Sequence, residues 1–134
     1  MNGQDFLRIA KEAFIPFLKE LGLEMDEPSM SGRFYRASFT GPAHAVSVSY
    51  EPGDGAFFVM VFGRKNGKLS DIDDRTKTPR LADLNSRYMP TITNKERVEN
   101  EVAFESVVAR DREERLLLKA AKELRLVLPK YLRS

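Results

Sequence analysis

The N-terminal segment carries apolar side chains at helical spacing. Phe6, Phe17 and Leu21 fall on one side of the segment, with further apolar residues between them, and charged residues fall mainly on the other side. This period predicts an amphipathic helix that packs one face against a core. Gly22 occupies the position at which a left-handed residue commonly ends a helix. Pro16 has no backbone N–H to donate, so we expect a kink in the last turn.

Four segments with the composition of strands follow, at residues 23–27, 33–40, 44–50 and 56–62. In the third of them valines alternate with serines, and this period of two predicts an antiparallel strand with one face in solvent. The fourth is apolar on both faces, so we expect it in the centre of the sheet. The Asn66-Gly67 pair after it predicts a tight hairpin turn and a short edge strand.

The second half of the chain has helical patterns. Thr78-Pro79 predicts a helix start, and the short helix that follows ends before Pro90. Together these elements predict an α+β fold with an N-terminal helix, an antiparallel sheet of about four to five strands, then a short helix and a long C-terminal helix. No linker divides the sequence, so residues 1–134 are predicted to form a single domain.

The last helix is the unusual feature of the sequence. Thr93 and Glu96 form a capping-box pattern, and no helix-breaking residue follows before Pro129, so we expect a helix over residues 93–128. At 1.5 Å per residue such a helix would be about 50 Å long. The run 110–115 is wholly charged. It leaves two interpretations open: the helix breaks there, or it projects past the body of the domain and meets a partner.

Within that run, Asp111 and Arg115 are spaced as an i,i+4 ion pair on a solvated helix face. The apolar residues between Leu116 and Leu128 supply more width than one helical stripe requires. This excess favours either deep packing or self-association. We therefore predict a partner-binding surface on this helix, formed by Leu116, Lys119, Lys122 and Leu126.

The composition is that of a globular protein, with 42% hydrophobic and 31% charged residues in a chain of 134. Cysteine is absent, which excludes disulfides, thiolate zinc sites and cysteine nucleophiles. No apolar run approaches the roughly 18–20 residues that span a bilayer, and the first residues lack the pattern of a signal peptide. The sequence therefore predicts a cytoplasmic protein without membrane contact.

The net charge of +2 is unevenly distributed along the chain. Residues 1–63 hold 5 basic and 8 acidic side chains, whereas residues 64–134 hold 17 basic and 12 acidic ones. This basic half supports an alternative hypothesis of weak nucleic-acid binding. In that alternative, bases would stack on the sheet at Arg33, Tyr35 and Arg36, where aromatic residues are interleaved with arginines. Cations near the end of a helix also oppose the helix dipole, which is a purely structural explanation of the same residues.

Two segments imitate catalytic motifs without matching them. Residues 63–70 contain the glycines and lysine of a phosphate-binding loop, but three residues separate the glycines instead of four. Leu69 also follows the lysine where the motif has Ser or Thr. His44 is the only histidine, and no Gly-x-Ser-x-Gly segment accompanies it. A hairpin turn and a structural histidine explain these residues.

The acidic residues Asp71, Asp73 and Asp74 are the best candidates for a metal site. Carboxylates are the ligands that Mg²⁺ and Ca²⁺ prefer. Arg75 and Lys77 follow them, however, where a calcium-binding loop would continue with ligands and a glycine. We therefore expect no metal and no cofactor, and an enzyme that uses this loop ranks as the third hypothesis.

Three short segments carry a resemblance to a known type of protein. They are Leu21-Gly22-Leu23 after the aromatic helix, Glu51-Pro52-Gly53-Asp54-Gly55 between strands, and Val61-Phe62-Gly63-Arg64. In this order they resemble small uncharacterised bacterial α+β proteins of the toxin-immunity type, over residues 6–70. The resemblance implies binding to another protein, such as a toxin, and transfers no catalytic residue.

The leading hypothesis from the sequence is a non-enzymatic protein-interaction module. It would be immunity-like or adaptor-like, act in a bacterial cytoplasm, and bind a protein partner or a second copy of itself. The absence of a complete catalytic motif and the apolar excess on the last helix favour it. Weak nucleic-acid binding is the alternative hypothesis.

Overall fold

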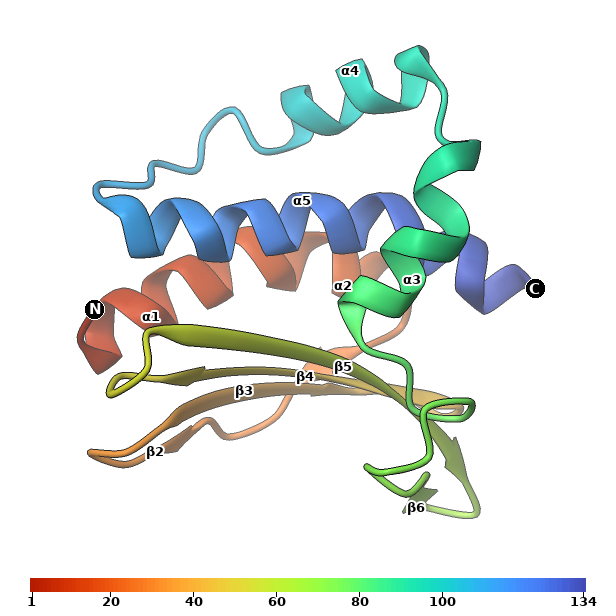
Figure 1. Cartoon of the computed structure of the whole chain (residues 1–134), viewed down its shortest axis with the longest axis horizontal. Coiled ribbons are helices and arrows are strands. Elements are labelled where there is room, and N and C mark those ends of the chain that lie inside the picture. Colours follow the sequence, from red (N-terminus) through yellow and green to blue (C-terminus); the bar gives the residue numbers. More distant parts are fainter.

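The computed structural model describes residues 1–134 and has an antiparallel sheet with helices packed on one of its faces (Figure 1). The predicted α+β fold is confirmed in its element order. The elements are α1 (Gly3–Ile9), a π-helical turn (Ala10–Phe14), α2 (Ile15–Glu20), β1 (Glu24–Met25), β2 (Ser29–Met30), β3 (Tyr35–Thr40), β4 (His44–Glu51), β5 (Ala56–Lys65), β6 (Lys68–Leu69), α3 (Leu81–Tyr88), a 3₁₀ turn (Met89–Thr91), α4 (Asn94–Ala103) and α5 (Arg112–Arg133).

The N-terminal helix is continuous, and its irregularity is a π-helical turn in its middle, one turn earlier than the kink predicted in the last turn. The π-helical turn ends at Phe14, two residues before Pro16, which cannot donate a backbone hydrogen bond. Gly22 ends the helix with a φ of 82°, as its position predicted. The helix buries Phe6, Phe14 and Leu18 completely against the sheet and α5.

The sheet has the strand order β1-β3-β4-β5-β6, with β2 paired to β3, and every pairing is antiparallel. Its helix-facing side includes Val48, which lies opposite Ala37 on β3 and Val59 on β5. The Asn66-Gly67 turn joins β5 to β6, and both residues have positive φ, as a tight hairpin of this kind requires.

The prediction that residues 56–62 form the central strand is wrong, because β4 lies between β3 and β5. The helix-facing residues of β5 join the core. Phe58 and its same-face neighbours lie on the other face of the sheet, which no helix covers. Ser47 and Ser49 of β4 are each only 7% exposed, although their pattern predicted a solvent-facing side. Larger residues of the flanking strands, such as Phe58 opposite Ser49, shield them.

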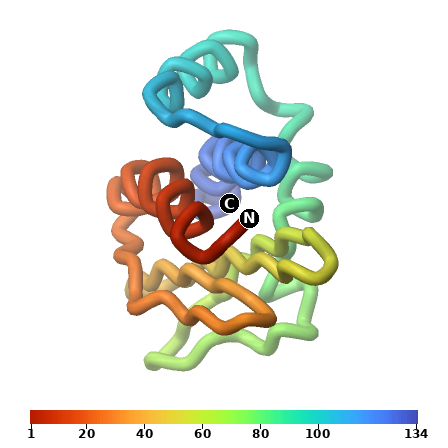
Figure 2. Tube along the Cα trace, turned by 90° about the vertical axis from the view of Figure 1, so that its left-hand side faces the viewer, coloured from red at the N-terminus to blue at the C-terminus, as the bar shows by residue number.

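The predicted helix over residues 93–128 is two helices, α4 and α5, joined by residues 104–111. The break lies at the edge of the charged run, where Asp111 caps α5 by accepting a hydrogen bond from the Glu114 N–H at 2.9 Å. The aspartate thus caps the helix instead of forming the predicted ion pair with Arg115. Figure 2 shows α4 as an outer layer beyond α5, away from the sheet.

Two predicted helix boundaries, the end of α5 and the start of α3, also differ from the structure. α5 continues through Pro129 to Arg133, so this proline does not stop the helix. α3 begins at Leu81 and not at Pro79, because the Pro79 carbonyl still accepts a hydrogen bond from Val61 at the sheet edge. The Thr93–Glu96 capping box of α4 is confirmed, with the Glu96 N–H 3.1 Å from the threonine hydroxyl.

The apolar excess of the last helix is used in packing. Leu117, Leu124 and Leu128 of α5 are fully buried, in one core with the N-terminal helix, the sheet and α3. Of the two sequence-based explanations for the excess, deep packing therefore accounts for most of it. No helix combines the length and the apolar character needed to cross a membrane.

Candidate functional site

A groove between α4 and α5 gathers most of the predicted partner-binding residues. Its volume is about 320 Å³, and Lys119, Lys122 and Leu126 all line it. The 3₁₀ turn closes one end through Met89. Leu116 lies one turn earlier on α5, outside the lining, with 36% of its surface exposed. We call this feature the α4–α5 groove.

Two of the cations that line the α4–α5 groove, Lys119 and Lys122, are paired within the chain, whereas Arg97 donates to the Met89 carbonyl at 3.4 Å. The Lys122 ammonium lies 2.9 Å from the Glu101 carboxylate, and the Lys119 ammonium lies 3.5 Å from Glu123. Farther along α5, Lys130 pairs with Glu96 at 3.4 Å. The Thr93 backbone N–H and Lys130 lower the pKa of the Glu96 carboxyl. Three cations and two carboxylates line the groove, so its net charge is a single positive one, which suits a polar protein surface better than a polyanion.

Helix α4 is turned with a polar residue inward and apolar residues outward. Asn100 is 2% exposed; it donates to the Lys122 carbonyl at 3.0 Å and accepts from Arg125 at 2.9 Å. Val98 and Val102 lie on the opposite side of α4, 65% and 56% exposed. A surface helix normally has the reverse orientation. Asn100 was not predicted from the sequence, although it lies four residues before the buried Phe104 and therefore on the same helical face.

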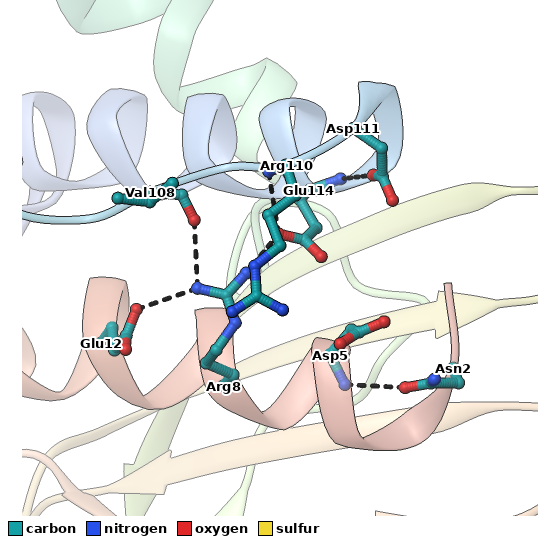
Figure 3. Close-up of polar contacts among 8 residues, drawn as sticks. All are labelled: Asn2, Asp5, Arg8, Glu12, Val108, Arg110, Asp111 and Glu114. Carbon is teal, nitrogen blue, oxygen red and sulfur yellow. Dashed lines mark hydrogen bonds and ion pairs between the residues drawn. The ribbon is translucent and has the colours of Figure 1, made fainter.

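A buried ion pair holds the start of α5 to the N-terminal helix (Figure 3). The Arg8 guanidinium contacts the Glu114 carboxylate, whose side chain is 2% exposed. Arg8 also donates to the Val108 carbonyl at 3.0 Å and to Glu12 at 3.2 Å. The Arg110 backbone N–H donates to Glu114 at 3.0 Å. The pair thus fastens residues 104–111 against the body of the protein and is structural.

Neither member of this ion pair was singled out from the sequence. Glu114 belongs to the charged run that suggested a solvated face, and Arg8 belongs to the charged side of the first helix. Glu114 is nevertheless spaced three and four residues before the buried Leu117 and Leu118. That helical phase was the signal that identifies it as inward-facing.

The residues of the nucleic-acid alternative do not form one surface. Tyr35 faces the helix layer, where its ring lies 5.8 Å from Phe6 and 5.9 Å from Tyr50. Arg36 points to the other face of the sheet and stacks on Phe34 at 5.2 Å, and Arg33 lies in the exposed loop before β3. Base stacking on Tyr35 would require its partly buried ring to give up its packing against the core.

The acidic loop is organised around its own backbone. Asp71 accepts a hydrogen bond from the Asp73 N–H at 2.9 Å, and Asp74 accepts from the Thr76 hydroxyl at 2.6 Å. That hydroxyl, together with the backbone N–H groups of Lys77 and Thr76, lowers the pKa of Asp74. The three aspartates do not converge, and no group of three or more potential ligands in the chain has the geometry to hold a metal ion.

His44 begins β4 beside two tyrosines. Its ring meets the Tyr131 ring edge-on at 6.1 Å, and the Tyr131 ring lies 6.5 Å from Tyr88. Burial lowers the pKa of His44, and burial likewise raises the pKa of the Tyr131 hydroxyl. No carboxylate or hydroxyl nucleophile contacts the imidazole, so the cluster has the character of packing.

A second groove, which the sequence did not indicate, runs along the free edge of β5. Its volume is about 320 Å³, and Phe57 and Val59 of β5 line one side. Residues of α3, such as Asn85, line another side, and Ala120 and Glu123 of α5 complete it. Glu123 also lines the α4–α5 groove, so the two hollows adjoin on α5. We call this feature the β5-edge groove.

Comparison with models of known protein families, with curated proteins and with solved structures finds no match for this chain.

Proposed function

We propose that this chain is a non-enzymatic protein-interaction module whose partner contacts α4 and the adjoining surface of α5. The orientation of α4 carries the proposal. Exposed Val98 and Val102 with a buried Asn100 are expected where a further surface covers the helix. The polar rim of paired charges beside these valines matches the usual anatomy of a protein interface.

The residues available for chemistry support the same proposal. The aspartates of the acidic loop bond to their own backbone, and His44 packs against an aromatic ring. Neither group faces the two adjoining grooves on α5. A partner of the toxin type, as the sequence resemblance implies, or an adaptor-type partner would fit this surface equally.

The proposal is tested by photo-crosslinking in cells of the organism from which the gene comes. A photoreactive residue at Lys119, on the rim of the α4–α5 groove, should give a discrete adduct with one protein. The matched control carries the same residue at Lys11, which is exposed on the N-terminal helix. The combined substitution Val98→Asp and Val102→Asp should abolish the adduct while the fold, followed by circular dichroism, is kept.

Two results would contradict the proposal. One is the absence of any adduct at Lys119 that exceeds the background at Lys11. The other is an adduct that the two aspartates do not weaken. An adduct between two copies of the chain would identify the partner as the protein itself, and sedimentation of the purified protein would then show a dimer.

A further inference from the structure

The edge of β5 is free over its first half and occupied over its second half. On the side away from β4, the Val61 N–H donates to Pro79 at 3.0 Å and the Gly63 N–H donates to Lys77 at 3.4 Å. Beyond them, β6 pairs with Arg64 and Lys65. No strand lies along residues 56–59 on that side. These residues therefore form an open edge.

Antiparallel geometry fixes what this open edge presents. Along a strand, the backbone N–H groups of successive residues point alternately to its two edges. Since Val61 and Gly63 donate to the outer side, the N–H groups of Phe57 and Val59 point to the same side. The segment 77–80 runs along this edge and turns away into α3 at Leu81. A further segment could pair with residues 56–59, beyond the point at which the segment 77–80 leaves the edge.

The β5-edge groove lies directly beside these free N–H groups. Most of its lining is apolar, including Phe57, Leu81 and Ala120, and one wall is formed by α3. The side-chain oxygen Oδ1 of Asn85, which also lines the groove, is buried and has no hydrogen-bond donor. A buried acceptor without a donor has lost its hydrogen bonds to water and gained none in return, so such groups are normally satisfied.

We propose that this edge binds an extended segment of another polypeptide as an added β-strand. Carbonyl groups of the segment accept from Phe57 and Val59, one of its N–H groups donates to Asn85, and a bulky aliphatic side chain enters the β5-edge groove. The inference rests on the proposed function as a protein-interaction module and names the kind of partner. Strand addition takes its affinity from main-chain hydrogen bonds and its specificity from such side-chain pockets.

The open edge favours an extended peptide over the other occupants. A helix has no free main-chain groups along its length, so it would leave both the strand edge and Asn85 unpaired. A second copy of the chain would offer only its own residues 56–59, because its segment 77–80 blocks the rest of the edge. Two folded copies joined by so short a ladder would bury far less than the roughly 1,200–2,000 Å² of a stable interface between folded proteins, whereas a peptide adds a side chain in the β5-edge groove to the same ladder.

The probe for the test is a phage-displayed library of random octapeptides, selected on the purified full-length protein. The selected peptides should share an aliphatic residue at one position and show further preferences at every second position, as expected of a strand. They should bind with a Kd that calorimetry can measure. N-methylation of the peptide amides is the diagnostic step. Methyl groups on alternate amides should weaken binding at least tenfold, and methyl groups on the amides between them should change it less than twofold.

The variant Asn85→Leu should stabilise the free protein and weaken its affinity for the peptide. It removes the unpaired oxygen, so the free protein should unfold at a higher temperature, while peptide affinity falls about tenfold. The matched control is Ser86→Leu, at the exposed neighbouring position of α3, which should leave affinity unchanged. A weaker affinity with a raised Tm cannot come from damage to the fold.

The outcomes separate this inference from the proposed function. Selected peptides that are insensitive to N-methylation and to Asn85→Leu, but lost in Leu126→Asp, would overturn strand addition and leave the interaction module standing. Failure of the library to yield a binder, together with a crosslink at Lys119, would do the same. Failure of both experiments would overturn both proposals. A dimer that the selected peptides dissociate would replace the extended peptide with a second copy.

Discussion

The ion pair between Arg8 and Glu114 should be the most costly polar contact to break in this protein. The side chain of Glu114 is 2% exposed, whereas that of Arg8 is 22% exposed and has further partners. Replacing Arg8 by Met leaves a buried carboxylate whose remaining donor is the Arg110 backbone N–H. Breaking a buried pair in this way costs about 3–5 kcal/mol, a large part of the roughly 5–15 kcal/mol that holds a domain folded.

The cost should be unequal for the two partners. Glu114→Gln keeps an acceptor for the Arg110 N–H and leaves an arginine that water and Glu12 still reach. We expect about 1–2 kcal/mol for this change, because it weakens charged hydrogen bonds without burying an unpaired charge. The double variant Arg8→Met/Glu114→Leu should lose less than the sum of its single variants, since apolar replacement of both partners removes the desolvation cost.

Urea unfolding followed by circular dichroism measures these differences. With an m value of about 1.5 kcal/mol/M, Arg8→Met should lower the midpoint by roughly 2–3 M. Arg75→Met is the control, because its pair with Asp83 at 2.6 Å is exposed, and it should cost no more than about 1 kcal/mol. The reasoning is refuted if Arg8→Met costs no more than this control, or if Glu114→Gln costs as much as Arg8→Met.

Three further predictions follow from single side chains. Burial lowers the pKa of His44 below 6.5, so the unfolded chain takes up a proton before the folded protein does as the pH falls. The free energy of unfolding should therefore decrease as the pH drops through about 6.5. His44→Gln should reduce this dependence on pH when unfolding is measured from about pH 7.5 to about pH 5. Thr93→Ala removes a helix cap worth about 1 kcal/mol, so amides of α4 should exchange hydrogen roughly fivefold faster, and unchanged exchange would contradict the assigned cap. In Gly41→Ala the new Cβ would lie 2.8 Å from the Gly22 carbonyl oxygen, which should cost about 1–3 kcal/mol, whereas Gly53→Ala meets open space and should be near neutral.

The sequence by itself determined the elements whose cause is local. Gly22 and the Asn66-Gly67 pair are placed by backbone sterics, and Thr93 caps α4 through a hydrogen bond three residues away. Helical and strand periods were sufficient to predict the α+β fold and its element order. These features depend on neighbours along the chain, so the chain alone carries the information.

Tertiary structure decided which positions are buried and which strand edge remains free. Asn100 turned inward, and Glu114 was buried, because partners more than twenty residues away supply their hydrogen bonds. The helix that local propensity allowed over residues 93–128 is interrupted at residues 104–111, which the Arg8–Glu114 pair fastens against the first helix. The open edge at residues 56–59 exists only because the chain turns into α3 at Leu81. The helical phase marks Asn100 and Glu114 as candidates for an inward face, but the partners that bury them, and the exposure of a strand edge, are properties of the assembled layers.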